Sequence, residues 1–158
     1  MRFLLPLLAL SACGGAGANL EGSVGGIDFE DVNVVFFGGP FIFFSNVTWS
    51  CLDVYWVSRT YNEGSEVADG RDFSAIQFAY SDPEVAEGLW NVAGEAAVSS
   101  AFLSQQGGAL RVWEGRGGSL DVVSVDDDFV DGSFNITFEA GAVSGTFTAE
   151  WCRNLKDN

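Results

Sequence analysis

Histidine is absent from the sequence, and this absence removes the usual base of nucleophilic catalysis. Ser-His-Asp and Cys-His arrangements both need an imidazole to accept the proton of the nucleophile. Paired carboxylates could still cleave glycosides, but among 22 Asp and Glu residues such a pair arises by chance. We therefore expect a protein that is not an enzyme and that carries no cofactor.

Basic side chains are scarce, with 7 Lys and Arg against 22 Asp and Glu and a formal net charge of −15. Proteins bind nucleic acids and anionic lipid surfaces through Lys and Arg side chains that neutralise phosphate groups. We therefore expect no nucleic-acid partner. The carboxylates are spread from Glu21 to Asp157, which is typical of a solvated surface.

Near the start of the chain, a run of apolar residues is too short to cross a membrane. Phe3–Leu10 would extend about 12 Å as a helix, against a hydrocarbon core of about 30 Å. One basic residue before this run and small residues after it are typical of an export signal. We expect residues 1–12 to be a signal peptide.

The four residues Leu10-Ser11-Ala12-Cys13 resemble the lipobox of bacterial lipoproteins. The resemblance implies cleavage before Cys13 and a diacylglyceryl group on its sulfur, so that a lipid anchor holds the exported chain in the membrane of the cell envelope. Gly14 follows the cysteine in place of Asp, which in that family indicates sorting to the outer membrane. The alternative is an ordinary secretory signal in which Cys13 has no role.

With Cys13 assigned to lipid, Cys51 and Cys152 remain as one pair in an oxidising compartment. A disulfide between them is the default expectation, and it would close a loop of about 100 residues between an early strand and the last one. A redox-active or metal-binding pair favours close spacing or helper histidines, and the chain has neither.

Beyond the leader, apolar residues alternate with polar ones, and Gly, Asn, Asp and Pro interrupt them about every ten residues. This pattern predicts an all-β fold, a single antiparallel β-sandwich or β-barrel of about 8–10 strands with almost no helix. The clearest pair is 132–140 and 143–151, which we expect to form a hairpin with Gly141 at positive φ. We expect the other strands at about 29–37, 41–49, 51–58, 73–80, 89–94, 98–105, 109–114 and 119–126.

Three further segments carry separate expectations. Residues 13–26 are rich in small residues and predict a flexible tether, followed by the all-β domain over 27–158. Asp82–Gly88 is the best helix candidate and is only about a turn long. The apolar runs 34–37 and 41–44 suit strands covered on both faces or, alternatively, an exposed apolar ribbon.

The end of the chain resembles small all-β bacterial lipoproteins of unassigned function. The matching segments are Gly132–Phe138, a Gly-Ser-Phe-x-Ile-x-Phe strand, and Gly145–Cys152, a Gly-x-Phe-x-Ala-x-x-Cys strand. Because that group has no agreed activity, the resemblance implies a fold and a compartment but no chemistry.

The densest acidic stretch is Asp126–Gly132, which raises the hypothesis of a weak Ca²⁺ site formed by Asp126, Asp128 and Asp131. The helical calcium-loop motif is not met, because Asp131 stands where that motif needs glycine. A hairpin turn uses the same residue types for local hydrogen bonds, and this alternative is favoured.

Five tryptophans are the remaining candidates for binding. Strand alternation places Trp56 with Leu52 and Val54, and Trp151 with Phe147 and Ala149, so both are expected in the core. Trp90 and Trp113 have polar neighbours and are the candidate ligand-binding residues.

Two functions therefore stay open. One is a non-enzymatic envelope module that meets a protein or glycan partner at its surface. The other is a lipocalin-like or glycan-binding domain that holds an apolar or sugar ligand. A ligand-sized cavity lined by Phe and Trp would favour the second function, and a filled interior with an exposed apolar ribbon around Phe36 to Phe44 would favour the first.

Overall fold

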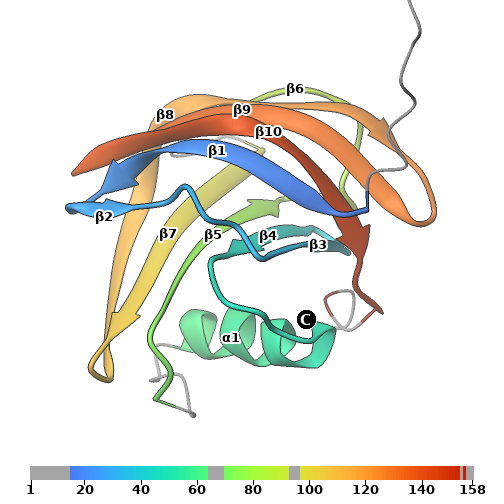
Figure 1. Cartoon of the computed structure of the whole chain (residues 1–158). Helices are drawn as coiled ribbons and strands as arrows, with labels where there is room; N and C mark the ends of the chain where they lie inside the picture. Colours follow the sequence, from blue (N-terminus) through green and yellow to red (C-terminus); the bar gives the residue numbers. More distant parts are fainter. Residues whose placement is uncertain (1–14, 64–69, 93–96, 154, 156–158) are drawn as a thin grey trace, which may run out of the picture.

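The computed structural model describes residues 15–63, 70–92, 97–153 and 155, and residues 58–63 by their backbone alone. The expected all-β fold is confirmed, in the form of a closed seven-stranded barrel (Figure 1). The barrel strands, in spatial order, are β3 (Val34–Gly38), β4 (Phe41–Ser45), β5 (Phe73–Tyr80), β7 (Val98–Gln106), β8 (Ala109–Val125), β9 (Phe129–Phe138) and β10 (Gly141–Trp151).

Six of the seven strand pairings in the barrel are antiparallel, and the one that closes it is parallel. The parallel pairing joins the end of β10 to β3, with Glu150 opposite Phe36 and Trp151 opposite Phe37. Three further strands extend the sheet: β1 (Gly17–Val24) pairs with β10, β2 (Ile27–Asp28) with β1, and β6 (Gly88–Asn91) with β8.

The predicted hairpin is confirmed as β9 and β10. Their pairing runs from Phe138 opposite Gly141 to Phe129 opposite Glu150. Gly141 has φ +151°, and a Cβ there would lie 1.9 Å from the carbonyl oxygen of Ser23. The two strands expected over 109–114 and 119–126 form one strand, β8, whose pairing with β9 shifts register near Gly115 and Gly117. The bulge bends β8 without ending it, and the strand curves over the barrel (Figure 1).

The prediction of a flexible tether over 13–26 is wrong for most of its length, because residues 17–24 form β1. This strand pairs with β10 over its whole length, from Gly17 opposite Thr148 to Val24 opposite Gly141. Leu20 and Val24 of β1 are buried in the core, and backbone pairing with β10 supplies the remaining interactions that stabilise this strand. A composition poor in large side chains therefore did not prevent ordering.

The strand expected over 51–58 is the helix α1 (Cys51–Glu63). Its start is a capping box: the Ser50 hydroxyl accepts the Asp53 backbone N–H at 3.3 Å, and an Asp53 carboxylate oxygen accepts the Ser50 backbone N–H at 2.9 Å. The hydrogen bond from the Ser50 backbone N–H lowers the pKa of Asp53 the most, and the hydrogen bond from the Ser50 hydroxyl lowers it further. The capping box starts a helix where alternation alone indicated a strand.

The face that α1 buries follows helical spacing. Val54 and Val57, three residues apart, are buried, whereas Leu52 and Trp56, four residues apart, are 52% and 54% exposed. The expectation that Trp56 belongs to the core is therefore wrong.

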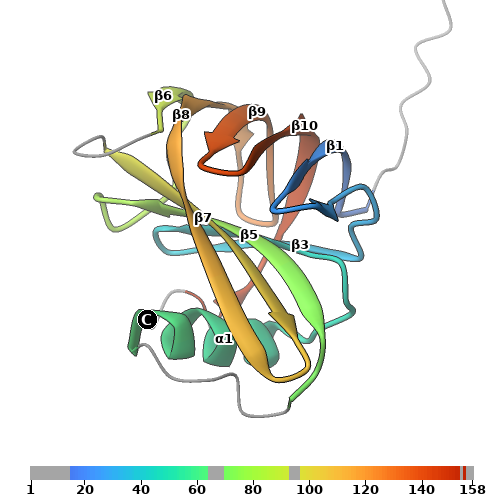
Figure 2. The same ribbon diagram turned by 90° about the vertical axis from the view of Figure 1, so that its left-hand side faces the viewer.

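The helix covers the outer face of the sheet formed by β3, β4, β5 and β7 (Figures 1 and 2). Phe43, Trp49, Phe73 and Leu103 form a second apolar cluster beneath it. The runs 34–37 and 41–44 are thus covered on both faces, by the barrel core inside and α1 outside. This outcome excludes the exposed apolar ribbon.

The disulfide between Cys51 and Cys152 is present. It joins the start of α1, rather than an early strand, to the residue that follows β10. Cys152 is fully buried in the cluster beneath the helix, and its backbone N–H donates to the Phe37 carbonyl at 2.7 Å. The bond therefore holds the helix to the strand pair that closes the barrel.

The helical turn expected over Asp82–Gly88 does not form. Residues 81–84 are bends, and the Val85 backbone N–H donates to the Gly39 carbonyl at 3.0 Å instead of to a carbonyl within a helix. The segment is thereby held against the β3–β4 turn. Within the described residues, no helix has the length and apolar character that crossing a membrane requires.

Aromatic rings fill the barrel interior. Phe44 is fully buried and contacts Phe78, Phe134 and Phe147, at ring-centroid distances of 6.0, 5.4 and 5.2 Å. Phe29 and Phe102, also buried, meet at 5.6 Å. Packing of this kind leaves the space between the walls occupied by the protein's own side chains.

Four buried polar groups lack a hydrogen-bond partner among the described residues, and one of them, the hydroxyl of Tyr80, yields a stability prediction. The hydroxyl of Tyr80 has no hydrogen bond within the described part of the chain, and burial raises the pKa of Tyr80. A buried hydroxyl without a partner costs about 1–3 kcal/mol. We expect Tyr80→Phe to leave the free energy of unfolding unchanged or to raise it by up to about 1 kcal/mol.

The pH dependence of this variant should differ as well. The folded state keeps the Tyr80 proton when the unfolded state begins to lose it near pH 10, so Tyr80 leaves the free energy of unfolding independent of pH below that value and lowers it as the pH rises further. Urea unfolding at pH 8 and pH 11 would measure the decline, which should be smaller in Tyr80→Phe. An equal decline of the free energy of unfolding in both proteins would contradict the raised pKa of Tyr80.

Candidate functional site

The three aspartates of the calcium hypothesis are not arranged to hold a metal ion, and the carboxylates of two of them, Asp126 and Asp131, have partners within the protein. Asp126 caps the β8–β9 turn, where one carboxylate oxygen accepts the backbone N–H groups of Asp128 and Phe129 at 2.9 and 2.7 Å. Asp131 lies on β9 and accepts the hydroxyls of Ser124 and Thr148 at 3.1 and 2.5 Å. The described residues contain no group of three His, Cys, Asp or Glu arranged to hold a metal ion. The favoured alternative, a hairpin turn, accounts for Asp126.

The structure does not bring Trp90 and Trp113 together, and both pack against the barrel core. Trp90 donates from Nε1 to the Ala86 carbonyl at 3.1 Å and meets the ring of Tyr80 at 5.3 Å. Trp113 contacts Phe102 at 5.8 Å and lies so close to Gly25 that a Cβ there would be 2.6 Å from its ring. Each therefore closes part of the interior, and neither lines the cavity described next. Cys13 lies outside the described residues.

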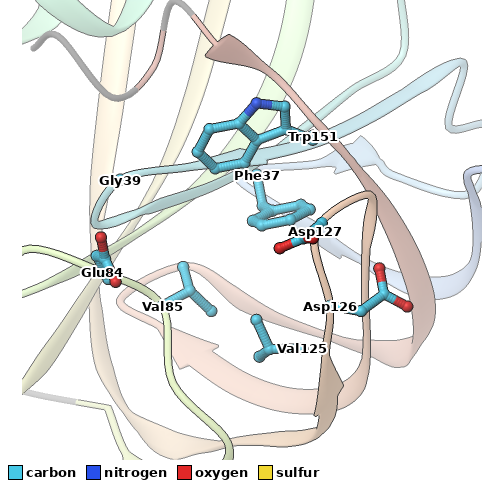
Figure 3. A pocket seen from close by; sticks show the side chains of 8 residues that line it. All are labelled: Phe37, Gly39, Glu84, Val85, Val125, Asp126, Asp127 and Trp151. Carbon is cyan, nitrogen blue, oxygen red and sulfur yellow. The ribbon is translucent and has the colours of Figure 1, made fainter.

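A surface cavity opens at the end of the barrel where β10 meets β3 (Figure 3). Its volume is about 480 Å³, within the range of 300–1,000 Å³ usual for small-ligand sites. We call it the rim pocket, and its lining residues are Phe37, Gly39, Glu84, Val85, Val125, Asp126, Asp127 and Trp151.

Four segments far apart in the sequence build the rim pocket. Phe37 and Gly39 come from the β3–β4 hairpin, Glu84 and Val85 from the segment before β6, Val125 to Asp127 from the β8–β9 turn, and Trp151 from the end of β10. Figure 3 shows Glu84 on one side and Asp126 on the other, with apolar side chains between them. The pocket thus has an apolar floor and an acidic rim.

Backbone hydrogen bonds hold these segments in place. The Trp151 N–H donates to the Asp128 carbonyl at 2.9 Å, which ties the end of β10 to the β8–β9 turn. Val85 is tied to Gly39, and the disulfide fixes Cys152 immediately after Trp151. Because each segment is anchored in this way, the pocket walls are ordered before any ligand arrives.

Trp151 was expected in the core, and this expectation is wrong. Phe147 and Ala149 point inward as predicted, but Trp151 is 37% exposed and Cys152, the next residue, is fully buried. The alternation breaks because β10 changes its partner from β1 to β3 near this point. The Trp151 ring packs against Phe37 at 5.2 Å and forms a wall of the pocket.

The described side chains that line the rim pocket offer hydrogen-bond acceptors, and the Trp151 indole N–H is the one donor among them. Its three ionisable side chains are all acidic, and Glu84, Asp126 and Asp127 are exposed to solvent. Among the described residues no Lys or Arg lines the pocket, although Arg153 lies two residues beyond Trp151. The cavity therefore combines an apolar base with uncompensated negative charge.

No protein family, curated protein or solved structure matches this chain.

Proposed function

We propose that the chain is an exported lipoprotein of the cell envelope, anchored through Cys13, whose barrel acts as a non-enzymatic interaction module. The observation that carries this proposal is the pairing of Cys51 with Cys152, which leaves Cys13 as the third cysteine. That residue is the one that follows the apolar leader and completes the lipobox-like Leu10-Ser11-Ala12-Cys13. Disulfides persist in compartments outside the reducing cytoplasm, which agrees with export.

The filled interior supports a surface role over a carrier role. Fully buried phenylalanines, Phe44 and Phe102 among them, occupy the space that a lipocalin-like protein would give to its ligand. The rim pocket, by contrast, opens to solvent and has ordered walls. A partner would therefore meet this protein from outside the barrel, and the outer membrane is the location that Gly14 favours.

Because β1 is a paired strand and not a flexible tether, it limits the distance between an anchored barrel and the membrane. Since β1 begins at Gly17, only residues 14–16 separate it from Cys13. A fully extended link from Cys13 to Gly17 spans at most about 14 Å. The barrel would thus stay close to the membrane surface. Gly17 lies opposite Thr148, so the anchored end is near the β10 segment that leads to Trp151.

The test is the Cys13→Ser variant of the full-length chain, expressed in a bacterium with a lipoprotein pathway. We expect it to move from the membrane fraction to the soluble envelope fraction and to keep the Cys51–Cys152 disulfide, because the lipid site and the disulfide are independent. Cell fractionation with non-reducing electrophoresis would measure both. The matched control is Cys51→Ala with Cys152→Ala, which should remain in the membrane fraction. Retention of Cys13→Ser on the membrane would overturn the anchor.

A further inference from the structure

We propose that the rim pocket binds the cationic side chain of a Lys or Arg residue presented by a partner protein. This inference rests on the proposed function, since it names the chemistry of the partner that the module would meet. It uses the pocket's hydrogen-bonding character, its apolar base and its charge.

The described lining of the rim pocket accepts hydrogen bonds far more than it donates them. The lining carboxylates of Glu84, Asp126 and Asp127 accept hydrogen bonds and, when ionised, donate none. Sugars carry hydroxyls that both donate and accept, and their sites commonly combine both kinds of group. Lys and Arg side chains carry three and five donors and no acceptor. An acceptor-rich rim therefore matches a cationic side chain better than it matches a glycan.

The apolar base of the rim pocket matches a ligand with a long aliphatic stem. Between the carboxylates lie Phe37, Val85 and Val125, and Trp151 forms the wall above them (Figure 3). Lys and Arg have long aliphatic stems that cover apolar surface while the charged head stays near water. The indole of Trp151 can also attract a cation placed over its face. A bare metal ion or a small inorganic cation would leave this apolar base uncovered.

The charge of the rim pocket favours a cationic ligand. The described residues of the pocket include three carboxylates and no basic group, on a chain of net charge −15. The Asp126 carboxylate is partly used by the backbone N–H groups of Asp128 and Phe129, which fixes the turn. The carboxylates of Glu84 and Asp127, on two different segments, accept no such hydrogen bond from the described residues and are the main candidates to receive the cation. Steering by the overall negative field would speed the encounter with a basic partner.

The test is an NMR titration of the folded, oxidised chain with a short capped peptide, acetyl-Gly-Gly-Arg-Leu-Gly-Gly-amide. The indole N–H signal of Trp151, identified by its loss in Trp151→Phe, reports on the pocket. We expect shifts confined to the pocket residues, with affinity about tenfold weaker for the same peptide carrying citrulline, which keeps the shape of Arg but not its charge. Raising the ionic strength should weaken the Arg peptide selectively.

Variants of the protein provide the matched comparison. Glu84→Gln with Asp127→Asn should weaken binding about tenfold, whereas Asp28→Asn with Glu114→Gln removes the same charge from exposed strand positions outside the pocket and should leave it unchanged. Trp151→Ala should also weaken binding, and Trp56→Ala, which removes an exposed tryptophan on α1, should not.

Three results would overturn the inference: equal shifts with the Arg and citrulline peptides, equal losses in the pocket and control variants, or shifts at these residues with neutral oligosaccharides but not with the Arg peptide. Binding to phosphatidylethanolamine vesicles without binding to the peptide would reassign the pocket to a lipid headgroup and would also overturn the inference.

If Cys13→Ser stays on the membrane while the peptide binds, the proposed anchor fails and the pocket inference stands. If the anchor holds and no peptide binds, the pocket inference alone fails.

Discussion

Replacing both Cys51 and Cys152 by Ala should lower the free energy of unfolding by about 4–5 kcal/mol. The two cysteines are 101 positions apart, so the bond restricts a large part of the unfolded chain, and in the chain-entropy description a loop of this size contributes about that amount. Alanine is the appropriate replacement because Cys152 is fully buried among apolar side chains, where a serine hydroxyl would add a separate penalty.

The measurement is urea unfolding of the oxidised protein, of the same protein under reducing conditions, and of the double variant. The reduced protein and the double variant should lose similar amounts, since both lack the crosslink. A loss below about 1 kcal/mol in both would contradict the chain-entropy argument and would mean that residual structure already restricts the unfolded chain.

This loss has consequences for where the protein folds. Small domains have a total stability of about 5–15 kcal/mol, so the crosslink contributes at least about a quarter of what is typical. An oxidising compartment would therefore favour the folded state. The bond also holds the residue after Trp151, so its reduction should loosen one wall of the rim pocket as well as destabilise the barrel.

Local patterns explain which parts of the fold could be predicted from the sequence. The β9–β10 hairpin was predictable because its strands are adjacent and alternate cleanly, with Phe134, Ile136 and Phe138 buried. The helix α1 was not, because Leu52, Val54 and Trp56 fit a strand, and only the Ser50–Asp53 capping box and the pair Val54 and Val57 indicate a helix. Two patterns competed there, and the capping interactions decided between them.

The β1 strand and the rim pocket needed information that the sequence does not carry locally. Prediction from composition weighs large apolar side chains, whereas β1 is held chiefly by backbone pairing with a strand more than a hundred residues away. The rim pocket depends on the parallel contact between β10 and β3, which closes the barrel and turns Trp151 outward. Neither the parallel contact nor the change of partner along β10 has a signal within either strand.

The second large effect is expected from Phe44→Ala, which should lower the free energy of unfolding by about 3–5 kcal/mol. The Phe44 side chain is fully buried and touches three other rings, so its removal loses apolar contact and leaves a cavity that rigid barrel walls cannot close. Phe41→Ala is the matched control. Phe41 lies on the same strand but is only partly buried, on the outer face near α1, and its loss should cost less than half as much. If Phe44→Ala does not fold, Phe44→Leu should still show a smaller loss in the same direction.

The cavity made by Phe44→Ala also tests what the barrel interior is for. An apolar cavity of about the size of a benzene ring stays dry and binds benzene or xenon, which raises the melting temperature by mass action. Benzene should therefore stabilise Phe44→Ala and leave the natural protein unchanged, because in the natural protein the side chains already fill this space. Stabilisation of the natural protein by benzene or by a longer apolar ligand would mean that the barrel opens to admit a guest. It would then favour a carrier of apolar molecules over a module that meets its partner at the rim.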